Sequence, residues 1–300
     1  MKMKKILVAV MTLAMSLTAA TTAFAATPVY QNGFDGSLGG AQTAVRVGDV
    51  DGLPPAPVLP TVDESITAQF DAGKNGQALY LDSSYGVILD AAAVGDTYTV
   101  AFWVNPARFS NFGPILQIGS DLLSANASAA WLNITKTDWD GDMAPVVWSR
   151  NEATTAWPWY AGGSGYIIPK NEWTHIAVTV DGTAVGTSDI MAVSQLYING
   201  ELLSSGDIAT GTFTGDAKVY LGINCWDALF KGLFDDVKIY NTVLTADEVK
   251  TAMNEPAAAA EATETATTDV PKTGVESFAL IFGLGAAVLG TGSLVLKKKK

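Results

Sequence analysis

Thr97 to Val104 reads Thr-Tyr-Thr-Val-Ala-Phe-Trp-Val, and this stretch decides the fold. Nearly all of its residues are β-branched or aromatic, the types that fit a pleated and buried strand. Trp173 to Val180, Trp-Thr-His-Ile-Ala-Val-Thr-Val, has the same character and ends at the turn dipeptide Asp181-Gly182. We therefore predict a strand in each stretch.

Further strand signals follow toward the C-terminus. Gln195 to Ile198 and Glu201 to Ser204 flank Asn199-Gly200, a hairpin signal because both turn residues accept a positive φ. Lys218 to Leu221 and Leu233 to Tyr240 have strand composition as well. Because no long segment shows a helical period, these strands predict an all-β protein.

One short helix is expected after the last strand. Thr245 and Glu248 form a capping box, and Thr245 to Met253 carries an apolar stripe at Val249 and Met253. The proline-rich segment Val45 to Ser65 is expected to be a surface loop. The sequence thus predicts one antiparallel β-sandwich over residues 26–254, closed by this helix.

Five motifs in order carry a family resemblance. They are Gln77–Asp82, Tyr98–Pro106, Asn171–Thr179, Leu196–Glu201 and Gly232–Asn241. The series resembles laminin-G-like domains over about residues 29–253. The resemblance implies the jelly-roll sandwich of the concanavalin-A-like lectins and glucanases. Because the motifs hold mostly core and hairpin residues, they indicate the fold more than the function.

Charge and rare residues exclude several function classes. The chain has 18 Lys and Arg against 30 Asp and Glu, a net charge of −12, so we expect no nucleic-acid partner. A single cysteine, Cys225, permits no intrachain disulfide and is expected to be a small buried hydrophobe. A single histidine, His175, permits no multi-histidine metal site.

The N-terminus indicates export. Met1 to Lys5 holds three lysines, an apolar run follows, and Ala23-Phe24-Ala25 is a small-x-small cleavage pattern. Residues 1–25 are therefore predicted to be a secretory signal peptide.

The C-terminus indicates attachment to a cell wall. Residues 255–269 are rich in Ala, Thr and Glu and are predicted to be a disordered spacer. Residues 270–300 combine a short motif, an apolar span at 278–296 and the basic tail 297–300. The motif consists of Val270, Pro271, Lys272, Thr273 and Gly274.

This order resembles the sortase sorting signal of Gram-positive surface proteins, with Val270 in place of the usual Leu. The resemblance implies transient membrane insertion, cleavage between Thr273 and Gly274, and covalent attachment to peptidoglycan. The span of 19 residues is about 28 Å long as a helix, so a retained membrane anchor is the alternative.

No catalytic constellation stands out. The glucanases on this fold carry Glu-x-Asp-x-x-Glu on one strand face, and the sequence has no such segment. Ser164 fails the Gly-x-Ser-x-Gly pattern because Tyr166 takes the fifth position. His175 lies in a strand motif, where a packed imidazole is the simpler interpretation than a general base.

Aromatic residues are the better binding signal. Flat rings match the C–H face of a sugar, and nearby Asp and Asn side chains can bond its hydroxyls. The aromatic residues in or beside Gly- and Asp-rich segments are Trp139, Trp148, Trp157, Trp159, Tyr160 and Trp226. The candidate ligand-binding residues among them are Trp139, Trp157, Trp159, Tyr160 and Trp226. The alternative is that these rings pack under loops at the rim of the sandwich.

A structural calcium ion is the one cofactor expected. In relatives on this fold a calcium ion ties the first and last strands together, and the resemblance places Asp235 among its ligands. Asp35 is the N-terminal partner proposed for it. A second candidate is Asp138, Asp140 and Asp142, for which a solvated Asp-Gly turn is the alternative.

The sequence thus favours an exported, wall-anchored and non-catalytic protein that binds a carbohydrate or an extracellular protein. Two alternatives stay open. The chain is a glycan-cleaving enzyme if two acids oppose each other in a groove, and a structural wall or fibre subunit if its surface has no cleft.

Overall fold

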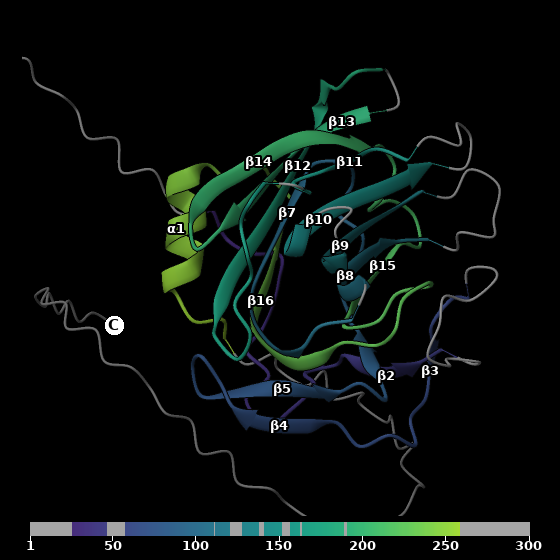
Figure 1. The fold of residues 1–300 in the computed structure, drawn as a ribbon, viewed down its shortest axis with the longest axis vertical. Coiled ribbons are helices and arrows are strands. Elements are labelled where there is room, and N and C mark those ends of the chain that lie inside the picture. The colour runs from purple at the N-terminus through teal and green to yellow at the C-terminus, as the bar shows by residue number, and fades with distance from the viewer. Residues whose placement is uncertain are drawn as a thin grey trace, which may run out of the picture. The chain divides into compact units, whose positions relative to one another are not determined.

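Two antiparallel sheets, each of eight strands within the described residues, pack face to face in the computed structural model (Figure 1). The structure describes residues 26–46, 58–110, 112–120, 128–137, 141–151, 157–162, 164–188 and 191–258. The predicted signal peptide at 1–25, the sorting signal at 270–300 and most of the spacer lie outside these residues. Among the described residues, no helix is long and apolar enough to cross a membrane.

The two sheets follow these orders. Sheet A runs β14 (Glu201–Ala209), β13 (Met191–Ile198), β12 (Thr174–Val185), β7 (Tyr98–Arg108), β16 (Lys231–Tyr240), β5 (Gln77–Asp82) and β4 (Gln69–Ala72), with β1 (Tyr30–Asn32) also paired to β16. Sheet B runs β11 (Trp159–Tyr160), β10 (Gly141–Asn151), β9 (Ser128–Thr137), β8 (Phe112–Gly119), β15 (Lys218–Leu221), β6 (Gly86–Ile88), β2 (Gln42–Val45) and β3 (Thr61–Val62). These orders confirm the predicted all-β sandwich.

The stretch that decides the fold becomes β7, a central strand buried on both faces. Tyr98, Val100 and Phe102 point into the main core between the sheets, whereas Ala101 joins a second apolar cluster outside sheet A. This alternation follows from the two-residue period of a strand. The second stretch forms β12, which pairs with β7 from Thr174 to Val180.

The predicted hairpin joins β13 to β14. Asn199 and Gly200 both have positive φ, 50° and 81°, as the dipeptide required. A Cβ added to Gly200 would lie 2.9 Å from Cγ of Lys250, so the close approach of the helix also calls for glycine.

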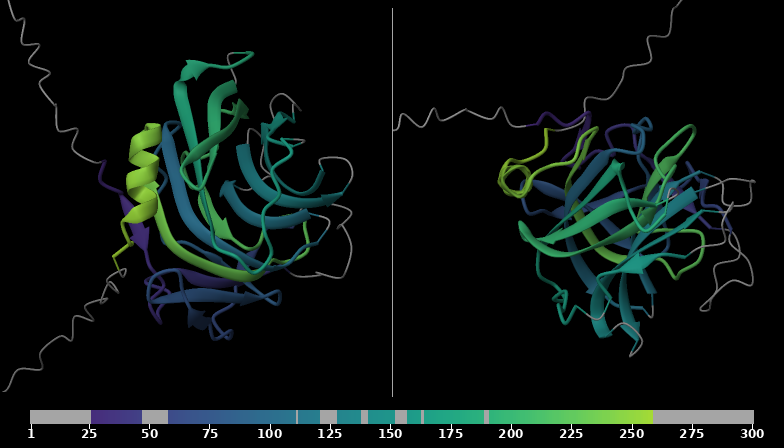
Figure 2. Two further views of the ribbon diagram at one scale, coloured as in Figure 1. Left: turned by 60° about the vertical axis from the view of Figure 1, so that its left-hand side comes forward. Right: turned by 90° about the horizontal axis from the view of Figure 1, so that it is seen from above.

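The predicted helix, α1 (Ala246–Asn254), lies along the outer face of sheet A (Figure 2). Thr245 caps it, and the predicted capping box with Glu248 is present. Its buried residues Val249 and Ala252 pack in the apolar cluster that also contains Ala101 and three neighbours. Those neighbours are Ala177, Tyr197 and Tyr240. The helix therefore covers sheet A and leaves sheet B free of it.

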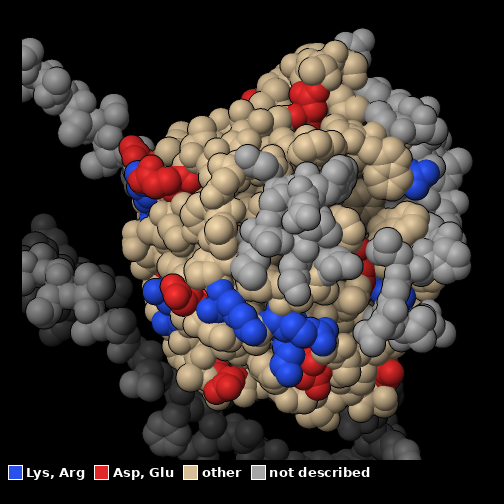
Figure 3. All heavy atoms as spheres, in the orientation of Figure 1, with Lys and Arg blue, Asp and Glu red and all other residues tan. Residues whose placement is uncertain are grey.

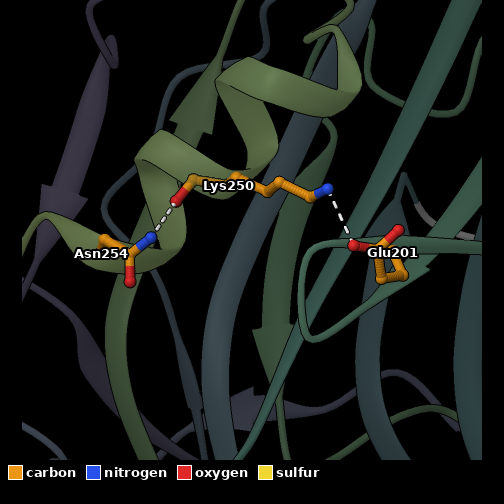
Figure 4. A network of polar contacts seen from close by, with 3 residues as sticks. All are labelled: Glu201, Lys250 and Asn254. Atoms are coloured by element: carbon orange, nitrogen blue, oxygen red, sulfur yellow. Dashed lines mark hydrogen bonds and ion pairs between the residues drawn. The ribbon is translucent and has the colours of Figure 1, made fainter.

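One ion pair links the helix to the hairpin, and a second polar contact lies within the helix. Lys250 Nζ lies 2.8 Å from Glu201 Oε1 at the start of β14, and Asn254 Nδ2 donates to the Lys250 carbonyl at 2.7 Å (Figure 4). Both charged side chains are well exposed to water, which screens the pair, so it adds little to the stability of the fold.

Charged side chains of both signs mix on the surface. On the face drawn in Figure 3, most Lys and Arg side chains form a band across the lower half, with Asp and Glu beside them. This mixture differs from the single-sign basic stripe with which proteins hold a phosphate backbone.

Candidate functional site

The outer face of sheet B carries a row of tryptophans. Ala130, Leu132 and Ile134 of β9 point into the core, so the alternating residues Trp131 and Asn133 point outward. No helix covers this face within the described residues, and the large rings instead pack on one another.

The strand register aligns these rings across three strands. Trp131 of β9 is paired with Trp148 of β10, and Trp148 is paired with Trp159 of β11. The rings of Trp148 and Trp159 have centroids 6.1 Å apart. Cross-strand aromatic pairs stabilise a sheet, and here they also build a continuous aromatic surface.

Two further tryptophans stand over this row. The Trp157 ring lies nearly parallel to that of Trp131, with centroids 6.1 Å apart and planes at 16°. The Trp226 ring is tilted by 60° against Trp157 at 6.5 Å. On the other side, Phe112 meets Trp148 edge to face at 6.5 Å.

These rings line an open pocket of about 230 Å³. Five of its lining residues are aromatic and three are polar. The lining residues are Phe112, Trp131, Asn133, Trp148, Trp157, Asn224, Trp226 and Asp227. A concave, mostly apolar site with a few convergent polar groups is the usual form of a small-ligand site.

The three polar residues form one hydrogen-bonded group. Oδ2 of Asp227 accepts from Nδ2 of Asn133 at 2.8 Å and from Nδ2 of Asn224 at 2.6 Å. Oδ1 of Asn224 accepts the main-chain N–H groups of Trp226 and Asp227, at 2.9 Å and 2.7 Å. The short loop after β15 is therefore held in one shape by its own side chains.

Gln117 of β8 fixes this loop to the sheet. Its Oε1 accepts from Trp131 Nε1 at 2.6 Å and from the Cys225 N–H at 3.1 Å. One buried oxygen thus positions both a wall of the pocket and the loop that carries Trp226 and Asp227. Arg46 also anchors the loop, because its Nη atoms donate to the carbonyls of Asn224 and Asp227.

Burial dominates the electrostatics of the pocket. Desolvation raises the pKa of Asp227, while the two asparagine amides and the Arg46 charge oppose that shift. Desolvation also raises the pKa of the Cys225 thiol to about 12. Cys225 is thus the buried, unreactive side chain that the sequence predicted.

The predicted ligand-binding residues divide between different places. Trp157 and Trp226 line the pocket, and Trp159 lies beside it against Trp148, 46% exposed. Tyr160 points the other way, into the core, where its hydroxyl bonds that of Ser194 at 2.6 Å. The prediction that Tyr160 binds the ligand is therefore corrected. Tyr160 follows Trp159 in β11, and successive residues of a strand face opposite sides of the sheet.

Other predicted residues take no part in the pocket. Trp139, Asp138 and Asp140 lie outside the described residues, and the side chain of Asp142 is not described. His175 is buried on sheet A beside Trp103, with ring centroids 5.2 Å apart. Burial and the Lys238 charge lower its pKa to about 3, so it is a neutral packed imidazole.

The calcium candidates meet at one turn. Asp35 Oδ1 accepts the N–H of Gln77 at 2.8 Å, and Asp235 Oδ2 accepts the N–H of Asn75 at 3.0 Å. Burial, with help from the neighbouring Asp236 charge, raises the pKa of Asp235 to about 7.

The donor type at this turn suits calcium, which takes carboxylate and carbonyl oxygens. Among the described residues, however, no three acidic, histidine or cysteine side chains lie together as a metal cluster.

Much of the pocket was missed from the sequence. Phe112, Trp131, Asn133, Asn224 and Asp227 were not among the expected site residues. A signal for two of them was present, because Ser128 to Ile134 alternates small or apolar inward residues with Trp131 and Asn133.

Comparisons with known proteins identify the superfamily of the fold. The family model described as the concanavalin A-like lectin/glucanases superfamily matches residues 76–250. Domain 4 of the extracellular arabinanase AbnA from Geobacillus stearothermophilus, solved with arabinotriose, is 26% identical with a TM-score of 0.53. The match covers 76% of this chain and 99% of that domain.

A second solved structure is similar at a lower score. The sialidase module CBM40 of Ruminococcus gnavus, solved with α2,3-sialyllactose, is 17% identical with a TM-score of 0.40. That match covers 52% of this chain and 82% of the module. No curated protein sequence matches the chain.

Proposed function

Since the chain belongs to the concanavalin A-like lectin/glucanase superfamily, we propose that it is a non-catalytic protein that binds a glycan in its aromatic pocket. The observation that carries the proposal is the pocket itself, in which five aromatic rings surround Asn133, Asn224 and Asp227. The rings would stack on the C–H faces of sugar units. The group of three polar side chains would orient the sugar by hydrogen bonds to its hydroxyl groups.

The arabinanase domain supports an oligosaccharide as the ligand. It shares the fold over nearly its whole length, and its structure was solved with arabinotriose bound. The aromatic surface of this chain extends beyond the pocket to the exposed ring of Trp159. A ligand longer than one sugar unit would use both.

The described lining of the pocket argues against hydrolysis. Glycosidases flank the scissile bond with two carboxyl groups, about 5–9.5 Å apart. Among the described residues that line the pocket, Asp227 is the one carboxylate, and two asparagine amides already hold one of its oxygens. Within this part of the chain the arrangement can bind hydroxyl groups but offers no acid–base pair.

Calcium is proposed as a structural ion rather than as part of the pocket. Asp35 and Asp235 would hold it at the β4–β5 turn, where it would neutralise the buried charge of Asp235. There it would link the first and last strands of sheet A.

The place of action is proposed from the sequence alone. The signal-peptide pattern and the motif Val270–Gly274 support export and sortase attachment through Thr273 to Gram-positive peptidoglycan. Fractionation of cells that express the full chain would test this. Release of the protein by a wall hydrolase would support it, and recovery in the membrane or cytosol would contradict it.

A glycan array probed with the domain tests the proposed function. The wild type should bind at least one glycan, and Trp157→Ala should lose at least about tenfold in affinity for it, about 1.4 kcal/mol. Leu202→Ala removes an exposed apolar side chain from sheet A and is the matched control, with unchanged binding. Absence of binding to every glycan would contradict the proposal.

A further inference from the structure

We infer that the pocket takes one sugar unit that carries no negative charge, and that Asp227 with Asn133 sets this selectivity. The inference rests on the proposed function, since it concerns the glycan that this same pocket would bind. It adds the chemical class of the inserted unit, which neither the fold nor the row of aromatic rings determines.

Asp227 lies where an inserted sugar would meet it. Its side chain is 8% exposed, and the carboxylate lines the pocket. Oδ2 is occupied by the amides of Asn133 and Asn224, whereas Oδ1 accepts no hydrogen bond from the described residues. One carboxylate oxygen therefore remains to accept a hydrogen bond from a ligand.

Two other atoms of the lining are buried and lack partners within the described residues. Asn133 Oδ1, an acceptor, and Trp226 Nε1, a donor, are both buried without a hydrogen bond, and both residues line the pocket. Buried polar groups are normally paired, so unpaired ones in a pocket indicate what a ligand supplies. Here the ligand must supply donors to Asp227 and Asn133 and an acceptor to Trp226.

Hydroxyl groups meet this demand and carboxylates do not. A hydroxyl both donates and accepts, so neighbouring hydroxyls of one sugar ring can satisfy all three atoms. A carboxylate only accepts, and it would leave Asn133 Oδ1 and Asp227 Oδ1 unpaired. It would also place a second negative charge beside Asp227, whose side chain is largely buried.

Two arginines lie near the pocket without lining it. Arg46 is buried and donates to the main-chain carbonyls of Asn224 and Asp227. The guanidinium carbon of Arg150 lies 4.6 Å from the centroid of the Trp157 ring. Neither arginine is among the residues that line the pocket, whereas Asp227 is, so an inserted anion would meet Asp227 first. A uronic acid or a similar acidic unit would therefore be excluded.

The size of the pocket limits the part of the glycan that enters it to one sugar unit. Its volume of about 230 Å³ lies below the range of about 300–1,000 Å³ typical of drug-sized ligands. The remaining sugar units of an oligosaccharide would lie outside the pocket, where Trp159 offers the next exposed ring.

Matched glycan pairs test the inference. The probes are neutral oligosaccharides on an array and the same oligosaccharides with their primary hydroxyls oxidised to carboxylates, measured at pH 8. The wild type should bind the neutral member of a pair at least about tenfold more tightly. Asp227→Asn keeps the size of the side chain and removes its charge, so the preference should shrink several-fold.

Asp247→Asn is the control for the loss of one charge, since Asp247 lies in α1 on the other sheet and is exposed. It should keep the wild-type preference. Thermal unfolding of each variant checks that it is folded, and Asn133→Asp supplies a second test because it adds negative charge to the pocket.

The outcomes separate the two proposals. Equal or tighter binding of the oxidised glycans, or an unchanged preference in folded Asp227→Asn, would overturn the inference and leave glycan binding intact. Failure to bind every glycan of both series would overturn the proposed function itself.

Discussion

Trp131 of β9 and Trp148 of β10 stand directly opposite each other in sheet B, and both point away from the core. Trp159 extends the pair to a third strand, and Trp157 and Trp226 close over it. A sheet face that met only water would not need so many large rings. Their arrangement around a pocket is the basis of the binding function proposed for this protein.

The effect of removing the Trp159 ring should depend on the length of the glycan. Its ring lies beside the pocket rather than in it, so Trp159→Ala should weaken binding of a trisaccharide several-fold and leave a monosaccharide unaffected. Titration calorimetry with ligands of increasing length would measure this. Equal losses for both ligands would place Trp159 in the pocket instead.

Gln117 should matter for both stability and binding. Gln117→Leu leaves the buried N–H groups of Trp131 and Cys225 without their acceptor, which should lower the free energy of unfolding by about 2 kcal/mol or more. The loop of Trp226 should shift as well, with weaker glycan binding even where the variant is folded.

Chemical denaturation and calorimetry would measure these two effects. Gln195→Leu is the matched control on sheet A, where the amide oxygen accepts from Tyr197 and, in the described part of the chain, from no other group. It should leave binding unchanged. A stable Gln117→Leu variant with wild-type affinity would show that this residue does not position the site.

The stability of the calcium-free domain should fall as pH rises toward 7. Asp235 has a pKa of about 7 in the folded state, above the ordinary value near 3.9, so the folded protein holds this proton more tightly. Its contribution is fully present below about pH 3.9 and is lost as pH rises through 7. Asp235→Asn should flatten this dependence in thermal melts in EDTA.

Calcium should restore the stability that the domain loses as pH rises. At pH 8 the wild type should melt at a higher temperature in millimolar Ca²⁺ than in EDTA, because an ion bound only to the folded state stabilises it. Asp235→Asn should respond less. Identical melts of the wild type in Ca²⁺ and EDTA would contradict the calcium proposal.

Local chemistry made sheet A predictable. Thr97 to Val104 has strand character strong enough to identify β7. Asn199-Gly200 fixes the hairpin between β13 and β14, and Thr245 with Glu248 fixes the start of α1. Each of these features depends on residues close together in the sequence, so a single sequence contains the necessary information.

The pocket was less predictable because it depends on pairing between distant strands. Pro114 and Pro145 interrupt the strand signals of β8 and β10, and β8 shifts register between Pro114 and Leu116. Trp157 and Trp226 could be proposed from composition. That they meet over Trp131, while Tyr160 turns into the core, is set by register and by the two-residue period of β11.

The most direct measurement is titration calorimetry of the array's best glycan against the wild type and a Trp157→Ala, Phe112→Ala double variant. Both substitutions remove walls of the pocket and leave the main core untouched. We predict measurable binding to the wild type and none to the double variant at an unchanged fold. Undiminished binding to the folded double variant would contradict the account, because the glycan would then lie elsewhere.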